Sequence, residues 1–161
     1  MAGADKPEWP PLLPLGFHNL DSAARRRLCV ERFPDSVTRP RIFANLESII
    51  AATNQQAISG HIWIDGSFVT AKLNPDDVDI ALMISRATLR ALNPAQKTFF
   101  DDFSDEKLYD RYKLDSYGIA IDEGTDDGDY TYAYWLRQFG FSRGDDPKGI
   151  IRIPVPFLVK P

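Results

Sequence analysis

The sequence predicts an α+β domain in which helices pack mainly on one face of a mixed sheet. Helical periodicity dominates residues 21–57, and from residue 61 onward short β-rich runs alternate with helical segments. That order of elements favours a mixed sheet. At 161 residues, the chain is long enough for one compact domain and too short for two ordinary ones.

The expected elements follow from apolar spacing, capping residues and prolines. Helices are predicted where apolar residues recur at three- and four-residue spacing after a cap or a proline, over residues 21–33, 42–57, 85–92, 94–103, 105–113 and 130–139. Strands are predicted where branched and aromatic residues form short runs, over residues 61–64, 78–84, 114–121 and 149–153.

Residues 1–19 are predicted to form an extended arm, and residues 20–161 a single domain. The prolines between residues 7 and 14 prevent a persistent helix or a central strand. Apolar residues such as Trp9 indicate that the arm lies against the domain or against a partner.

Composition excludes several classes of protein. Apolar residues make up 43% and charged residues 26%, as in globular proteins. The net charge of -4 argues against an extended surface for nucleic acid. Cys29 is the only cysteine, so no internal disulfide can form, and without a leader pattern we expect a cytoplasmic protein. No apolar run is long enough to span a bilayer, so we expect no membrane insertion.

Two aspartates stand two positions apart at the start of the strand predicted over residues 78–84. In a strand, Asp77 and Asp79 present carboxylates on one face, while Val78 and Ile80 face the core. Like charges so placed repel each other, which disfavours the pair in a plain structural strand. A divalent cation bound between the two carboxylates removes this repulsion. Mg²⁺ suits such a site, because it prefers carboxylate oxygens together with substrate phosphates.

A glycine-serine turn precedes this strand. Gly66 permits a close backbone approach, and Ser67 can cap a short helix over residues 68–72 whose free amides point toward an anion. The phosphates of a nucleoside triphosphate are expected there, with Gly66, Ser67 and Lys72 as the binding residues. Taken singly, each signal is weak, but a strand, Gly-Ser turn, short helix and Asp-x-Asp strand in this order are specific.

This order resembles the nucleotidyltransferase superfamily that includes DNA polymerase beta. Within it, the chain looks most like small single-domain members from bacterial toxin-antitoxin or phage-defence loci. Among them is an uncharacterised family with segments similar to residues 65–70 and 147–153. The signature covers residues 62–84, and the looser likeness covers most of the chain.

The resemblance implies a nucleotidyltransferase-type sheet, a Mg²⁺ or Mn²⁺ cofactor and a third acidic residue on a later strand. Asp115 is the best-placed candidate, with Asp101, Asp102 and Asp122 as rivals. In this reading Asp77, Asp79 and Asp115 bind metal, and Asp115 assists deprotonation of the acceptor.

Two further features have a functional and a structural interpretation. Arg143, Lys148 and Arg152 surround a turn and either grip phosphate, a second substrate or an acidic partner, or are solvated loop charges. Aromatic residues near the predicted helix 130–139 either stack a base or pack in the core. These residues are Tyr130, Tyr134, Trp135, Phe139 and Phe141.

The resulting hypothesis is a metal-dependent enzyme that transfers a nucleotide from a nucleoside triphosphate to a protein side chain or an RNA end. A second hypothesis retains the fold without catalysis, as a protein-binding partner such as an antitoxin. A third is a nucleotide sensor that binds triphosphate and transfers nothing.

Overall fold

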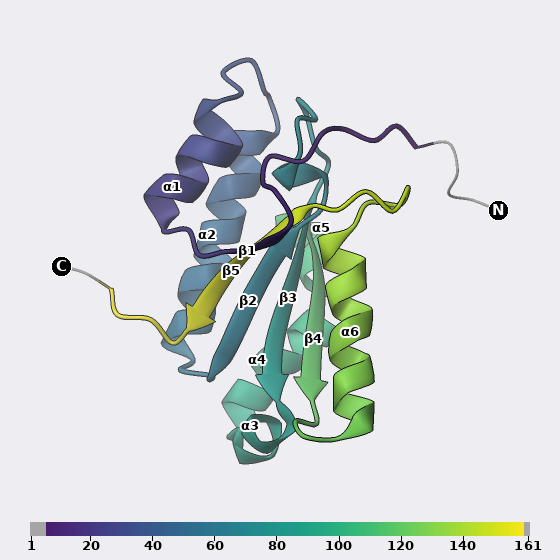
Figure 1. Cartoon of the computed structure of the whole chain (residues 1–161). Helices are drawn as coiled ribbons and strands as arrows, with labels where there is room; N and C mark the ends of the chain where they lie inside the picture. Colours follow the sequence, from purple (N-terminus) through teal and green to yellow (C-terminus); the bar gives the residue numbers. More distant parts are fainter. Residues whose placement is uncertain (1–5, 160–161) are drawn as a thin grey trace.

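A five-stranded mixed sheet in the order β1-β5-β2-β3-β4 forms the centre of the molecule (Figure 1). The computed structural model describes residues 6–159. Strand β2 is antiparallel to β3 and β5, whereas β4 is parallel to β3 and β1 is parallel to β5. The strands are β1 (Gly16–His18), β2 (Gly60–Asp65), β3 (Val78–Ser85), β4 (Leu114–Ile121) and β5 (Gly149–Val155).

The helices are divided unequally between the two faces of the sheet. Helices α2, α4 and α5 lie on one face of the sheet and α6 lies on the other (Figure 1). Their apolar residues belong to two separate core clusters. The predicted α+β class and mixed sheet are therefore confirmed. The helical elements are α1 (Ser22–Arg26), the π-helical turn η1 (Arg27–Glu31), α2 (Arg39–Gln55), the 3-10 turn η2 (Ser67–Val69), α3 (Arg86–Ala91), α4 (Pro94–Ser104), α5 (Leu108–Tyr112) and α6 (Asp126–Gly140).

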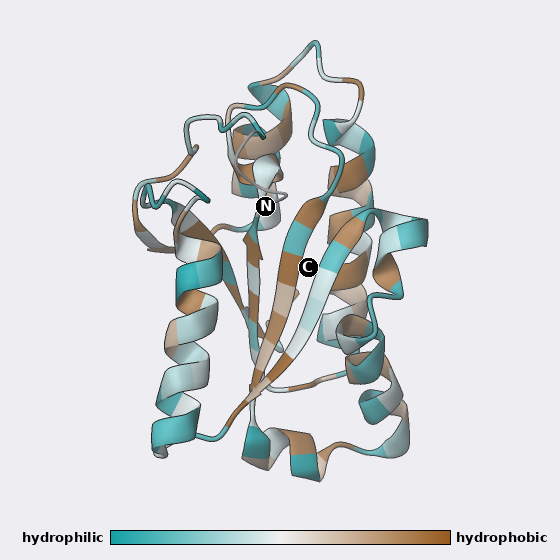
Figure 2. Cartoon of the chain, turned by 90° about the vertical axis from the view of Figure 1, so that its right-hand side faces the viewer, coloured by the Kyte–Doolittle hydropathy of each residue, from teal (hydrophilic) through white to brown (hydrophobic). Residues whose placement is uncertain are grey.

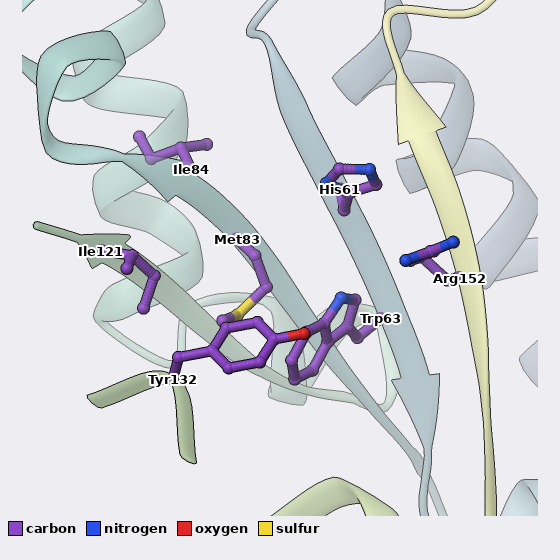
Figure 3. A pocket seen from close by; sticks show the side chains of 7 residues that line it. All are labelled: His61, Trp63, Met83, Ile84, Ile121, Tyr132 and Arg152. Atoms are coloured by element: carbon purple, nitrogen blue, oxygen red, sulfur yellow. The ribbon is translucent and has the colours of Figure 1, made fainter. Parts of the chain in front are cut away.

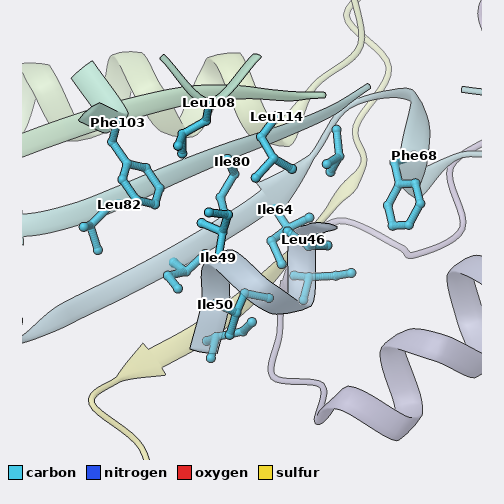
Figure 4. Close-up of a cluster of buried hydrophobic side chains, with 14 of the residues drawn as sticks. Leu46, Ile49, Ile50, Ile64, Phe68, Ile80, Leu82, Phe103, Leu108 and Leu114 are labelled. Carbon is cyan, nitrogen blue, oxygen red and sulfur yellow. The ribbon is translucent and has the colours of Figure 1, made fainter. Parts of the chain in front are cut away.

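The larger core lies between the sheet and helices α2, α4 and α5. Ile64, Ile80 and Leu114 come from three adjacent strands and are fully buried. Figure 4 shows them meeting side chains of α2, including Leu46 and Ile49. Apolar colouring is accordingly concentrated along the central strands in Figure 2. This face gives the strands that carry the candidate site a rigid support.

The second core is smaller and lies under α6. Trp63, Ala81 and Met83 alternate along β2 and β3 with residues of the larger core. Phe139 of α6 packs on them, with its ring centroid 6.1 Å from that of Trp63. The α6 face is therefore only partly apolar, which leaves room for polar groups at the end of the sheet.

Capping residues fix three of the helix starts. The Ser85 side chain accepts from the Thr88 amide at the start of α3, and Asn93 forms a capping box with Gln96 before Pro94. Helix α6 begins at Asp126, earlier than the predicted Tyr130, because Thr125 caps it. Acidic residues in its first turn complement the helix dipole and favour this earlier start.

The segment before residue 20 contains a strand that the sequence did not predict. Past the last proline of the arm, Phe17 pairs with Ile150 of β5 and adds an edge strand to the sheet. Pro11 forms an isolated bridge with Thr70, and the Leu13 carbonyl accepts from the Gly149 amide. These residues lie along the body of the protein.

The predicted helix over residues 68–72 is wrong in extent. The structure contains only the single turn η2, for which Gly66 occupies the N-cap position and makes no side-chain capping bond. The segment after η2 is extended because it bonds to other parts of the chain, described below. The predicted helix over residues 21–33 likewise divides into α1 and η1, where Cys29 and Val30 both enter the core. Within residues 6–159, no helix has the length and apolar character needed to cross a membrane.

Candidate functional site

Three aspartates stand side by side on three adjacent strands. Asp79 of β3 is paired with Asp65 of β2 on one side and with Asp115 of β4 on the other. Directly paired residues project from the same face of a sheet, so the three side chains share the α6 face. Their neighbours Ile64 and Ile80 are buried in the opposite core.

A cleft of about 760 Å³ opens over these aspartates. It lies between the end of the sheet, α6 and the loop that leads to β5. Its lining combines carboxylates, cations and aromatic rings. The lining residues are Asp65, Asp79, Asp115, Tyr117, Tyr134, Trp135, Arg137, Gln138, Phe139, Phe141, Ser142, Arg143 and Lys148.

Gly66 forms the turn at the edge of this cleft. Its backbone has φ 85° and ψ -168°, a conformation that is essentially restricted to glycine. A Cβ at this position would clash with the carboxylate of Asp79. Glycine is therefore required both by the backbone and by the approach of Asp79.

Asp65 and Lys148 form an ion pair at the back of the cleft. Lys148 Nζ lies 2.6 Å from Asp65 Oδ2, and the two side chains are only 14% and 3% exposed. Burial raises the pKa of Asp65 to about 7, although the Lys148 ammonium acts in the opposite direction. The second carboxylate oxygen, Oδ1, is buried without a hydrogen-bond partner among the described residues. Such an oxygen can accept a hydrogen bond from a ligand in the cleft.

The pKa of the Asp79 carboxylate is raised to about 7, as is that of Asp65. Burial raises the pKa of Asp79 first, and neighbouring carboxylates raise it further because each disfavours a second negative charge. These neighbours are Asp65, Asp115 and Asp77. Three carboxylates thus disfavour the charge on Asp79, and a bound cation would offset this repulsion.

Asp77 lies immediately before β3 and is only partly buried. Burial raises its pKa, and the Asp115 carboxylate raises it further. The expectation that Val78 and Ile80 face the core is confirmed. Asp77 therefore approaches the cluster from a loop, whereas Asp79 is fixed within the strand.

Tyr117 orients Asp115. Its hydroxyl donates a hydrogen bond to Asp115 Oδ2 at 3.1 Å, and the two side chains are two positions apart on β4. The ring of Tyr117 packs against Trp135 of α6, with centroids 4.9 Å apart. Burial and the Asp115 carboxylate both raise the pKa of Tyr117, so the hydroxyl remains a donor.

The rival aspartates lie elsewhere. Asp101 and Asp102 are on α4 and pair with Lys97 and Lys107, respectively. Asp122 follows the end of β4 remote from Asp115. Neither α4 nor this end of β4 contributes to the cleft.

The predicted cations are divided between two places. Arg143 and Lys148 line the cleft, whereas Arg152 lines a separate pocket of about 140 Å³ (Figure 3). There, Arg152 lies over the ring of Phe17, 4.7 Å from its centroid, and donates to Asn19. Lys72 pairs with Asp76 at 3.0 Å. Of these cations, Lys148 is the one that pairs with an aspartate of the site.

Residues 7–154 match a family of unknown function, DUF6932. The chain belongs to this family. No curated protein and no solved structure matches it. The matched segment of this DUF6932 protein contains the three strand aspartates, the Gly66 turn and the whole lining of the cleft.

The carboxylate oxygens in the cleft of this chain suit a hard divalent cation. In residues 6–159, His, Cys, Asp and Glu side chains form no group of three or more arranged to hold a metal ion by themselves. Mg²⁺, however, commonly takes one or two protein carboxylates and completes its octahedron with water and substrate phosphates. Asp77 and Asp79 would hold such an ion. Burial and then repulsion by neighbouring carboxylates raise both pKa values, and a bound cation would offset that repulsion.

Sequence reasoning missed the roles of Asp65, Tyr117 and the Asp65–Lys148 ion pair in the site. Asp65 directly follows the apolar residues 62–64, so a buried carboxylate at a strand end was visible in the sequence. Its pairing with Lys148 depends on β5 lying next to β2, which no local pattern specifies. Tyr117 is two positions from Asp115, and strand alternation places both on one face.

Proposed function

We propose that this protein is a metal-dependent nucleotidyltransferase of the type found in the DNA polymerase beta superfamily. It would transfer a nucleotide from a nucleoside triphosphate to a hydroxyl group on a macromolecule, either a protein side chain or an RNA end. The main support is the position of Asp79, held between Asp65 and Asp115 beside the Gly66 turn and inside a cleft.

In this proposal Asp77 and Asp79 hold Mg²⁺ or Mn²⁺, with Asp115 as the third acidic residue. The ion supplies charge neutralisation at the phosphates and helps to align the reacting groups. Asp79 is the more rigid of the first two, because β2 and β4 flank its strand. Asp77 can adjust, because it precedes the strand.

The reaction would join the acceptor oxygen to the α-phosphorus as the bond to the leaving pyrophosphate breaks. The proton of the acceptor hydroxyl passes to Asp115, whose Oδ2 is held by Tyr117. Catalysis of this kind depends mainly on positioning and on charge neutralisation, so few protein groups are needed.

The remaining cleft residues suit the substrate. In this proposal the backbone amides of Gly66 and Ser67 bind the phosphates, although η2 is too short to add an appreciable helix dipole. Arg143 and Lys148 supply positive charge, and Tyr134, which is 48% exposed, offers a ring for stacking a base. Lys72 would have to leave Asp76 to reach phosphate.

Incubation with each α-³²P-labelled nucleoside triphosphate tests the proposal. Reactions contain Mg²⁺ or Mn²⁺, with and without extract of a bacterial cell, and the label is then sought on protein and on RNA. The expected result is metal-dependent label on one acceptor, absent from matched reactions with Asp77→Asn.

Two other outcomes identify the alternatives. Triphosphate binding without label transfer would support a nucleotide sensor. Neither binding nor transfer, combined with a biological activity that Asp77→Asn retains in full, would support a protein-binding partner such as an antitoxin. In a toxin-antitoxin or phage-defence setting, that activity is measured as bacterial growth or phage plaque number.

A further inference from the structure

Arg39, the first residue of α2, is a buried cation that pairs with no carboxylate among the described residues. Its side chain is fully buried. The guanidinium instead donates to four backbone carbonyls, at distances of 2.6 to 3.2 Å. These carbonyls belong to Cys29, Phe68, Thr70 and Lys72.

Aromatic rings complete the surroundings of this guanidinium. It lies 3.7 Å from the centroid of Phe33 and 5.3 Å from that of Phe68. Burial lowers the pKa of Arg39 to about 10, so the side chain stays charged at neutral pH. A buried charge is costly unless dipoles compensate it, and here the carbonyl dipoles and the two rings do so.

Three of the four carbonyls belong to the segment 68–72, which connects the Gly66 turn to the loop before Asp77. The same segment also forms backbone hydrogen bonds with residues 10–12, near the N-terminus. The Leu12 amide donates to the Val69 carbonyl at 3.0 Å, and the Ala71 amide donates to the Pro10 carbonyl at 2.9 Å.

The two sets of bonds alternate along the segment. Even-numbered residues 68, 70 and 72 present carbonyls to Arg39, and odd-numbered residues 69 and 71 bond to residues 10–12. This two-sided bonding holds the residues after η2, from Thr70 onward, in an extended conformation. It also explains why the predicted helix over residues 68–72 does not form.

We propose that Arg39 and residues 10–12 clamp the segment 68–72 and thereby hold the Gly66–Ser67 turn and Asp77 in position for a nucleoside triphosphate. Arg39 is a positioning residue, since it lies on the core side and does not line the cleft. The clamp itself follows from the contacts above, whereas its effect on triphosphate binding rests on the proposed function.

Two substitutions of Arg39 and one matched control test the clamp. Arg39→Lys keeps the charge but loses the planar fork of donors, and Arg39→Met removes both. Arg25→Met is the control, because Arg25 is also buried, at 5% exposure. Its guanidinium pairs with Glu47 at 2.8 Å and donates to the Leu20 carbonyl, not to the carbonyls of the segment 68–72.

Amide hydrogen exchange of the full chain without nucleotide measures how firmly the clamp holds the segment 68–72. In Arg39→Lys, the amides of Val69, Thr70, Ala71 and Lys72 should exchange at least about tenfold faster than in wild type, while those of β3 keep their rates. Arg25→Met should leave the segment unchanged. Unchanged rates in Arg39→Lys, or equal acceleration in Arg25→Met, would overturn the clamp. Arg39→Lys decides the question even if Arg39→Met does not fold.

The effect of the clamp on triphosphate binding is measured as the affinity for ATP, GTP, CTP and UTP with Mg²⁺. Each variant is measured at a temperature where it is fully folded. Arg39→Lys should weaken the triphosphate that wild type prefers by about tenfold, and Arg25→Met by less than about twofold. Unchanged affinity despite faster exchange would overturn the positioning role. If wild type binds none of the four, the proposed function fails, and the exchange experiment still decides the clamp.

Discussion

The two faces of the central sheet are built from alternate residues of the same strands, yet they differ in almost every physical property. On the face toward α2, Ile64, Ile80 and Leu114 are fully buried among apolar side chains. On the face toward α6, the paired neighbours Asp65, Asp79 and Asp115 line a cleft. Each aspartate is thus a direct chain neighbour of a core residue, but the core residue stabilises the fold and the aspartate destabilises it. Substitutions on the two faces should therefore have separable effects on stability and on function.

The largest expected effect is on the cleft face. Asp79→Asn is nearly isosteric and removes a carboxylate that the metal needs, so nucleotide transfer should fall by roughly a thousandfold. The melting temperature without metal should stay the same or rise, because repulsion with Asp65 and Asp115 is relieved. Label transfer and thermal unfolding measured on the same preparation check both effects. Transfer at the wild-type rate would exclude Asp79 from the catalytic site.

On the core face, Ile80→Ala should cost about 3 kcal/mol of unfolding free energy, because it leaves a cavity in a fully buried position. The affinity for triphosphate should change by less than about threefold, since the neighbouring Asp79 stays in its strand. Urea unfolding and equilibrium binding give the two values. A loss of affinity as large as the loss of stability would show that the two faces are coupled.

The pH dependence of stability should also separate the faces. The folded-state pKa values of Asp65 and Asp79 lie above the unfolded value, so the folded protein binds these protons more tightly. Their contribution to stability is complete below about pH 4 and is lost as the pH rises through about 7. Without metal, wild type should therefore lose on the order of 2 kcal/mol between pH 5 and pH 8.

Asp79→Asn should flatten this dependence, whereas Ile80→Ala should retain it. Mg²⁺ affinity should change in the opposite direction, rising with pH as the carboxylates lose their protons. Thermal unfolding at several pH values, with and without Mg²⁺, measures both trends. Parallel wild-type and Asp79→Asn curves would contradict the assignment of the pH dependence to the cleft.

The smallest expected effect concerns Ser67. Its hydroxyl does not cap η2, so Ser67→Ala should leave stability unchanged and weaken triphosphate binding only about threefold. Gly66→Ala provides the contrast, because its Cβ would meet the Asp79 carboxylate in a backbone conformation that favours glycine. Isothermal titration with triphosphate and Mg²⁺ ranks the two variants, and a larger effect for Ser67→Ala would argue against the proposed phosphate position.

Local patterns in the sequence were sufficient for most elements of the fold. Ser85 and Pro94 correctly marked the starts of α3 and α4, and the run 114–121 is strand β4 as expected. Local reasoning failed where distant segments decide the conformation. Strand β1 exists because β5 lies beside it, and the chain is extended from Thr70 onward because Arg39 and residues 10–12 bind it.

In the candidate site, too, local sequence patterns predicted some features, whereas others depend on distant segments. Spacing placed Asp79 opposite to the core, whereas the resemblance to the nucleotidyltransferase superfamily proposed Asp115 on a later strand. Spacing also grouped Arg152 with Arg143 and Lys148, although Arg152 lines a different pocket. The ion pair of Asp65 with Lys148 required the order of strands, which three-dimensional packing determines.

The position of β5 has a consequence for the order in which the protein folds during synthesis. Strands β2, β3 and β4 and the three aspartates emerge from the ribosome before β5 and the adjacent Lys148. Until β5 pairs with β2, the nascent sheet exposes an open edge and Asp65 has no ammonium partner. Pairing of β5 with β2 therefore covers the exposed edge and brings the Lys148 ammonium to Asp65. Until β5 has been synthesised, the chain cannot contain an assembled cleft.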